Sequence, residues 1–131
     1  MKDSELYELA VKAKEHSYSP YSGYAVGAAV LTDSGSVYSG CNIENASYGA
    51  TICAERNAIF KAVSMGERKI VKIAIAGSTD EAAWPCGICR QVMTEFATEE
   101  FYVIVKDNGK LCTCSLKELL PHSFTSDNMN K

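Results

Sequence analysis

The hydrophobic and polar positions of the chain predict helices and strands that alternate along its whole length. Near the amino end, apolar residues recur at the spacing i, i+3, i+4 and i+7, which predicts one face of an amphipathic helix. They are Leu6, Leu9, Ala10 and Ala13. We expect Asp3 or Ser4 to cap this helix and Ser19-Pro20 to end it. Strands at residues 26–31 and 36–41 should then form a hairpin around Asp33-Ser34-Gly35.

The rest of the chain continues the alternation. A polar loop at 42–51 leads to a helix at 53–65, a strand at 70–76 and a helix at 87–97. Strands at 101–105 and 110–114 follow, and the capping box 115–118 opens a short helix that Pro121 closes. The strand at 70–76 is apolar almost throughout, as in sheets covered on both faces. We therefore predict an α/β protein with three layers, α/β/α, around a mixed sheet of five strands.

Length, composition and charge narrow the possibilities further. The chain has 131 residues with 47% hydrophobic and 22% charged side chains, so we expect a single globular domain over 1–131 with a disordered polar tail at about 125–131. The net charge of -3 argues against a nucleic-acid partner. No apolar run approaches the roughly 20 residues that cross a membrane, and the acidic amino end does not resemble a signal peptide. We expect a cytoplasmic protein.

Two cysteine motifs carry the candidate chemistry: Cys53-Ala54-Glu55, and Pro85-Cys86-Gly87-Ile88-Cys89 some thirty residues later. Three thiolates would hold Zn²⁺ and leave its fourth position to water, as in catalytic zinc sites. A redox pair is the alternative for Cys86 and Cys89, but redox chemistry does not require the third cysteine and the acid. We expect the remaining cysteines, at positions 41, 112 and 114, to pack in the core or sheet.

Glu55 follows a predicted ligand by two residues and is free to move protons beside the metal-bound water. Cys53 and the Cys86/Cys89 pair fall at the predicted starts of two helices, whose unpaired N–H groups favour thiolates. Because three thiolates leave the ion with a net negative charge, we expect Arg56 to donate hydrogen bonds to a cysteine sulfur. For Arg90 we consider the same role or a surface ion pair. The combined motif is the signature of zinc nucleobase deaminases.

With these motifs in place, the chain resembles the small cytidine deaminases over nearly its whole length. The matching stretches are Ser19-Pro20-Tyr21-Ser22, 26–29, 40–49, Cys53-Ala54-Glu55-Arg56, 85–91 and Leu119-Leu120-Pro121. The resemblance implies a hydrolase of pyrimidine salvage with one Zn²⁺ per subunit. It would convert cytidine and deoxycytidine to uridine and deoxyuridine plus ammonia. It also implies a homotetramer whose active sites are shared between subunits.

The resemblance further implies a set of substrate-binding residues. Asn42 and Glu44 match positions that bind ribose hydroxyls, and the backbone of Ala54 matches a contact to the base. Tyr24 stands where the family usually has phenylalanine, at an aromatic position near the base. Tyr48 lies in the region of subunit contacts, and Phe124 matches an aromatic that reaches into a neighbouring site; a plain hydrophobic anchor is the alternative for Phe124.

The same motifs allow three other interpretations. Blasticidin S deaminases share both cysteine motifs, although the run 42–48 favours ordinary cytidine. Deaminases of polynucleotides need a basic, aromatic-rich path that this acidic chain lacks. A non-catalytic structural zinc site would need a fourth protein ligand, from Cys41, His16 or Cys112, but the spacing fits no zinc ribbon. Neither His16 nor His122 is assigned to the metal.

Overall fold

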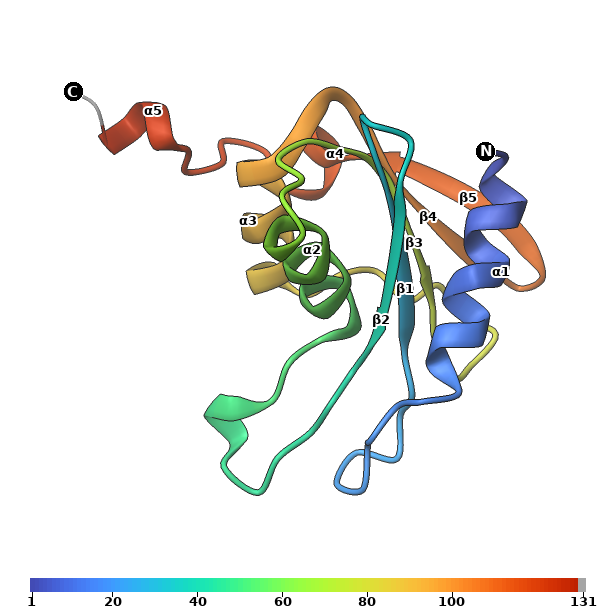
Figure 1. Cartoon of the computed structure of the whole chain (residues 1–131). Helices are drawn as coiled ribbons and strands as arrows, with labels where there is room; N and C mark the ends of the chain where they lie inside the picture. The colour runs from blue at the N-terminus through green and yellow to red at the C-terminus, as the bar shows by residue number, and fades with distance from the viewer. Residues whose placement is uncertain (130–131) are drawn as a thin grey trace.

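A computed structural model describes residues 1–129 of the chain and shows helices on both faces of one sheet (Figure 1). The helices are α1 (Asp3–Lys14), α2 (Ala54–Ser64), α3 (Gly87–Phe96), α4 (Leu116–Leu119) and α5 (Ser126–Met129), with a 3₁₀ turn at Tyr48–Ala50. The strands are β1 (Gly27–Thr32), β2 (Val37–Cys41), β3 (Ile70–Ala76), β4 (Ala97–Asp107) and β5 (Lys110–Ser115).

The sheet has five strands in the order β2-β1-β3-β4-β5. Strands β3 and β4 are parallel and joined through α3, whereas the other neighbours are antiparallel. The sheet is therefore mixed, as predicted. The parallel pair matters for the site because β3 leads, through the loop 77–86, to the start of α3.

Each face of the sheet is covered by its own hydrophobic cluster. Helix α1 packs Leu6 and Ala10 on one face, against Ala29, Ala74 and Ile104. On the other face, α2 and α3 pack around a larger cluster of buried side chains from every central strand. Figure 1 shows α1 on the opposite side of the sheet from α2 and α3, which makes the three predicted layers. The capping box is also confirmed, since Ser115 and Glu118 cap each other at the start of α4.

Three sequence predictions about the ends of elements were wrong. Helix α1 begins after Lys2, whose N–H donates to Glu5, and it ends at Lys14 rather than at Ser19-Pro20. Asp3 does not cap the helix because its carboxylate binds residues of the sheet. Strand β4 begins at Ala97, directly after α3, and so is longer than the apolar run at 101–105 that predicted it. Its first residues are mostly polar and exposed, which hides them from a hydrophobic pattern.

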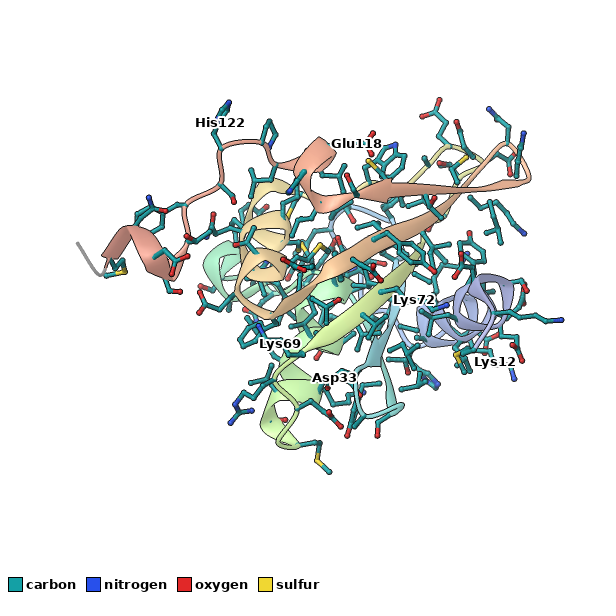
Figure 2. All side chains as sticks on the ribbon, turned by 90° about the horizontal axis from the view of Figure 1, so that it is seen from above. Lys12, Asp33, Lys69, Lys72, Glu118 and His122 are labelled. Atoms are coloured by element: carbon teal, nitrogen blue, oxygen red, sulfur yellow. The ribbon has the colours of Figure 1, made fainter. Side chains whose placement is uncertain are left out.

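A polar network fastens α1 to the sheet. Lys72 on β3 is buried, and its ammonium donates to Asp3 at 2.8 Å and to the Met1 carbonyl at 2.7 Å. The Tyr102 hydroxyl donates to the same Asp3 oxygen at 2.7 Å. Figure 2 shows Lys72 between the sheet and α1. Partial burial raises the pKa of Asp3, but the bonds from Lys72 and Tyr102 outweigh it and lower that pKa overall.

We expect Asp3→Ala to lower the free energy of unfolding by about 1–3 kcal/mol at pH 7, because it leaves the Lys72 ammonium buried without its counter-ion. Since the folded pKa of Asp3 is lowered, its ionised form stabilises the protein above about pH 4, the unfolded value. That contribution disappears as the pH falls below it. Urea unfolding at pH 7 and pH 3 should therefore show a smaller difference between wild type and variant at pH 3. An equal difference at both pH values would contradict the ionic role.

Two further findings concern membranes and the tail. Among the described residues, no helix is long and apolar enough to span a bilayer. Of the tail expected to be disordered, Ser126–Met129 form the short helix α5, and residues 130 and 131 lie outside the described residues.

Candidate metal centre

The two cysteine motifs meet where α2 and α3 begin. Cys53 is the residue immediately before α2, and Cys86 is the residue immediately before α3. Cys89 lies in the first turn of α3 and is completely buried. As predicted, all three sulfur atoms therefore lie at helix starts, where free N–H groups and the helix dipole favour negative charge.

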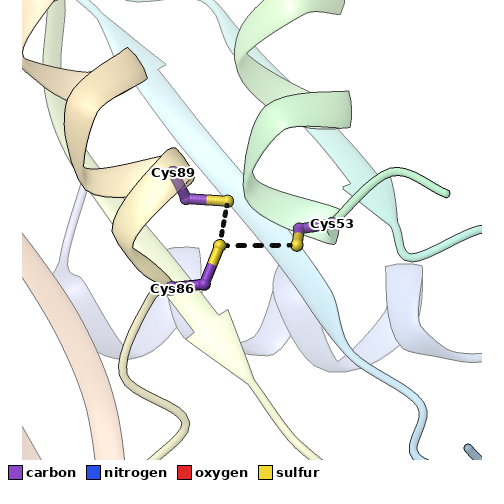
Figure 3. Close-up of side chains that lie close together, drawn as sticks. All are labelled: Cys53, Cys86 and Cys89. Atoms are coloured by element: carbon purple, nitrogen blue, oxygen red, sulfur yellow. Dashed lines mark hydrogen bonds between the residues drawn. The ribbon is translucent and has the colours of Figure 1, made fainter. Parts of the chain in front are cut away.

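The three sulfur atoms are close enough to share one ion. Sγ of Cys86 lies 3.7 Å from Sγ of Cys53 and 3.4 Å from Sγ of Cys89 (Figure 3). All three atoms lie within 4.8 Å of one another. A tetrahedral Zn²⁺ with bonds of about 2.3 Å to sulfur separates its ligands by about 3.8 Å. Among residues 1–129, no other group of cysteine, histidine or acidic side chains forms such a cluster.

The three sulfur atoms of the cluster also influence one another's protonation. The interaction with the Cys89 thiol is the largest influence on Cys53; with the bonds from Arg56 and Cys86 it outweighs burial and lowers the pKa of Cys53 to about 5. The same interaction, together with burial, raises the pKa of the Cys89 thiol. Because the thiolate is the form that binds zinc, a cation held by all three sulfur atoms would displace the remaining thiol protons.

Arg56 supplies the positive charge that the sequence predicted beside the cluster. Its Nη2 lies 3.5 Å from Sγ of Cys53, and the hydrogen bond to Cys53 is the largest influence that raises the pKa of Arg56. Nε of Arg56 is buried without a hydrogen-bond partner among the described residues. A guanidinium held this way stabilises an electron-rich sulfur cluster.

Within residues 1–129, Arg90 neither binds a cysteine sulfur nor forms a surface ion pair, the two roles considered from the sequence; it binds backbone carbonyls instead. Its Nε donates to the carbonyl of Pro85 at 2.8 Å, and its Nη1 donates to the carbonyl of Leu119 at 2.7 Å. Arg90 therefore ties the segment before Cys86 to the end of α4, and it fixes one half of the cluster through the backbone.

Glu55 is buried one residue inside α2, with 5% of its surface exposed. Burial is the main reason that the pKa of its carboxyl rises to about 7, and the charge of Cys53 adds to the effect. A carboxyl group with this pKa can both accept and donate a proton near neutral pH, which is what acid–base catalysis requires.

A cavity of about 410 Å³ opens beside the cluster. Cys53, Cys86, Ala54 and Glu55 line its metal end, and Tyr24, Asn42 and Glu44 also line it. The remaining lining residues were missed by the sequence analysis; they are Val26, Thr51, Ile52, Ile75, Ala82, Ala83 and Trp84. Most are apolar and could not be separated from ordinary core positions, although Trp84 stands directly before the Pro85-Cys86 motif.

Asn42 and Glu44 are held in place by the loop 17–26. The Asn42 amide oxygen accepts from Ser17 Oγ at 2.5 Å and from the Val26 N–H at 2.9 Å, and its nitrogen donates to the Tyr24 carbonyl at 2.8 Å. One Glu44 oxygen accepts from the N–H groups of Tyr21 and Ser22 at 2.9 and 3.1 Å, and the other accepts from Ser22 Oγ. These bonds, that of the Ser22 side chain foremost, lower the pKa of Glu44.

The last two predicted substrate residues lie outside this cavity. Tyr48 is 77% exposed and lines a smaller hollow, of about 230 Å³, with Tyr21, Ser22, Glu44 and Thr51; its ring meets that of Tyr21 edge to face. Phe124 is also exposed, and its carbonyl accepts a hydrogen bond from Gln91 at 2.7 Å. Within one chain, neither aromatic ring is part of the cavity beside the cysteines.

A family model described as the cytidine and deoxycytidylate deaminase zinc-binding region matches residues 1–105. The chain belongs to this deaminase family. It is 48% identical to a cytidine deaminase of Halalkalibacterium halodurans over 95% of this chain and 96% of that protein. The crystal structure of a cytidine deaminase from Burkholderia pseudomallei superimposes with a TM-score of 0.89 at 43% identity, covering 95% and 100% of the two chains. A blasticidin-S deaminase of Bacillus cereus is 33% identical over 94% and 92%.

Membership in the deaminase family agrees with the three sulfur ligands that the site offers to a metal ion. The region that the family model describes as zinc-binding includes Cys53, Cys86 and Cys89. Their sulfur atoms have the spacing of three corners of a zinc tetrahedron. Both the family and the local geometry therefore identify zinc as the cofactor of this chain, and the deaminase fold predicted from the sequence is confirmed.

Proposed function

We propose that the chain hydrolyses cytidine and deoxycytidine to uridine and deoxyuridine, with release of ammonia. One observation carries the proposal: the buried acid Glu55 and two of the three clustered cysteines, Cys53 and Cys86, line one end of a cavity that also exposes polar groups suited to a sugar. When bound by Cys53, Cys86 and Cys89, zinc would supply an acidified water at its remaining position.

Glu55 is the proposed proton carrier of the reaction. With a pKa near 7 it takes a proton from the attacking water and delivers it to the ring nitrogen beside the amine-bearing carbon. Once the water oxygen is bonded to the amine-bearing carbon, Glu55 takes the remaining proton of that hydroxyl group and transfers it to the amine; the carbon–nitrogen bond then breaks, ammonia leaves and the carbonyl of uridine forms. Burial holds the carboxyl in the cavity and keeps bulk water from competing for these protons. The backbone of Ala54, at the first position of α2, is the proposed contact to the base.

Asn42 and Glu44 are the proposed sugar-binding residues, and their existing bonds limit what they can do. Both acceptor positions of the Asn42 oxygen are filled, which leaves one N–H of its amide nitrogen. One Glu44 oxygen holds two bonds and the other holds one, which leaves one acceptor position. One free donor and one free acceptor match a single hydroxyl group, which can accept from Asn42 and donate to Glu44.

We therefore expect Glu44→Gln to raise KM for cytidine about tenfold and to leave kcat within about twofold, since the sugar lies away from the reacting carbon. We assign the bound group to the 3′-hydroxyl, which both nucleosides carry, so the factor should be the same for 2′-deoxycytidine; an effect seen with cytidine alone would assign the 2′-hydroxyl instead. Steady-state kinetics with both nucleosides will check this. A fall in kcat as large as the fall in kcat/KM would place Glu44 in the chemistry instead.

The proposal includes a homotetramer with shared active sites and a cytoplasmic location. Tyr48 and Phe124 are exposed aromatic side chains, so both are available for contact with a neighbouring subunit. In the assembly, Phe124 of one subunit would reach the cavity of another, and Tyr48 would lie at the contact. A cytoplasmic location suits a site made of three reduced cysteines.

Blasticidin S deamination is the second candidate, favoured by the relative from Bacillus cereus. The two activities differ in what the sugar end of the cavity must accept. Adding cytidine to the zinc-loaded protein and following the loss of cytosine absorbance tests the main proposal, and the same assay with blasticidin S tests the alternative. We expect kcat/KM to be far higher for cytidine. Turnover of blasticidin S alone would reverse the assignment.

A further inference from the structure

We propose that Gly77 and Ser78, the two residues directly after β3, are positioning residues that hold Tyr24 as a wall of the nucleoside cavity. The inference rests on the proposed function, since it assigns these residues to substrate binding. Neither residue lines the cavity itself. They act through Tyr24 and Ala25, which lie just before the start of β1, the strand that pairs with β3.

The Ser78 side chain continues the pairing between β1 and β3 beyond the point where their backbone hydrogen bonds end. The last pair between β1 and β3 is Gly27 opposite Ala76, so the register continued by two residues places Ala25 opposite Ser78. There the Ser78 hydroxyl accepts from the Ala25 N–H at 2.7 Å and donates to the Ala25 carbonyl at 2.7 Å. One hydroxyl thus makes both bonds that a backbone pair would exchange, and it fixes the residue after Tyr24.

Gly77 leaves the room that the Tyr24 phenol occupies. A methyl group at residue 77 would overlap the Tyr24 hydroxyl, and it would lie 3.0 Å from the Tyr24 Cζ and 2.9 Å from the Ala83 Cβ. From the other side, the Lys14 ammonium donates to the Gly77 carbonyl at 3.0 Å and holds this backbone against α1. Gly77 is thus the residue that admits a tyrosine at position 24.

Two further hydrogen bonds hold the backbone of Tyr24 itself. Its N–H donates to Ser22 Oγ at 3.0 Å, and its carbonyl accepts from the Asn42 amide at 2.8 Å. Ser78 adds to these bonds by holding the backbone of the next residue, Ala25, whereas Gly77 leaves the space that the ring and hydroxyl of Tyr24 occupy. Because Tyr24 belongs to the cavity wall and not to the metal end, loosening it should weaken substrate binding and spare the proton transfers.

The first test removes the Ser78 hydroxyl. We expect Ser78→Ala to raise KM for cytidine about fivefold with kcat within about twofold, the effect of one or two lost hydrogen bonds. Ser78→Thr keeps the hydroxyl and should restore the wild-type KM. Thr79→Ala, which removes a neighbouring exposed hydroxyl with no hydrogen-bond partner among the described residues, is the matched control. An unchanged KM in Ser78→Ala, or a Ser78→Thr variant as impaired as Ser78→Ala, overturns the proposal.

The second test is a double-mutant cycle between positions 77 and 24. Gly77→Ala should raise KM more than about tenfold in the wild-type background, because the tyrosine must move away from the added methyl group. In a Tyr24→Phe background the overlapping hydroxyl is gone, so the same substitution should cost at least about threefold less. An equal penalty in both backgrounds would show that the hydroxyl does not lie against Gly77.

A binding readout separates this inference from the proposed reaction. Trp84 is the single tryptophan of the chain and lines the same cavity, so its fluorescence can follow titration with uridine, the proposed product. The Kd for uridine should rise in Ser78→Ala by the same factor as KM. A wild-type protein that neither converts cytidine nor binds uridine overturns both proposals. If the wild type converts cytidine and binds uridine, but the Ser78→Ala variant has unchanged KM and Kd, only the positioning role of Gly77 and Ser78 is overturned.

Discussion

Glu55→Gln is expected to lower kcat for cytidine by about a thousandfold and to retain the metal. The amide has nearly the same shape as the carboxyl group but cannot carry a proton between the water, the ring nitrogen and the leaving amine. Glu55 is buried at the metal end of the cavity, and the cluster that would hold the metal consists of three cysteines without it. The substitution should therefore leave the metal ligands intact. Zinc content by atomic absorption and steady-state kinetics will measure the two effects separately.

The matched control for this substitution is Glu95→Gln. Glu95 is an exposed acid on α3, so the same chemical change there should leave kcat, KM and zinc content at their wild-type values. If Glu55→Gln deaminates cytidine at a near-normal rate, the proton carrier is another group. If it loses the metal as well, Glu55 belongs to the metal site and not to the proton transfers.

Cys89→Ala is expected to abolish both zinc binding and activity. Its sulfur is completely buried and lies 3.4 Å from Sγ of Cys86, so a methyl group in its place leaves two ligands for the ion. We expect the zinc content of the purified variant to fall at least about tenfold, and kcat at least about a thousandfold. The thermal unfolding midpoint should also fall, because the ion no longer joins the starts of α2 and α3.

Cys114→Ala is the control for cysteine loss. Cys114 is half-buried on β5 and is not one of the three clustered ligands. That variant should retain zinc and activity. A Cys89→Ala protein that still carries one zinc and still converts cytidine would contradict the three-sulfur site, and equal losses in both variants would point to general damage.

Most of the fold could be predicted because local patterns and tertiary structure agree. The strand at Ile70–Ala76 has the predicted bounds, since its apolar run is buried on both faces. The start of β4 could not be predicted, because Ala97 joins the sheet by pairing with Ile70 and the polar residues that follow it bury no apolar side chain. Lys72 in the middle of an apolar strand was a visible anomaly, yet its partner Asp3 is distant in sequence.

Part of the candidate site could likewise be predicted from the sequence and part could not. The sequence spacing predicted the metal cluster, because each motif places its sulfur atoms at one helix start. The cavity wall could not be predicted from spacing. Trp84 and Ile52 come from separate loops and meet only in the folded chain. The contacts of Ser78 with Ala25 depend on strand register, which no local pattern specifies.

The roles of Tyr48 and Phe124 depend on an assembly beyond one chain. Both rings are exposed and lie outside the cavity beside the cysteines. The shared-site proposal gives them a function, and it makes the sedimentation behaviour of the protein a direct check. A monomer with full activity would rule that proposal out without affecting the metal site.

The central claim is that three cysteine sulfur atoms hold one zinc and leave its fourth position for water. Counting metal and thiols together tests it most directly. Atomic absorption combined with alkylation of the native protein, read out by mass spectrometry, should show one zinc per chain and, among the six cysteines, zinc-dependent protection of only Cys53, Cys86 and Cys89; Cys41 is shielded by burial with or without the metal. Removal of zinc should expose these three thiols to alkylation. Protection of a fourth cysteine by the same ion would show a closed, structural site and would contradict the account.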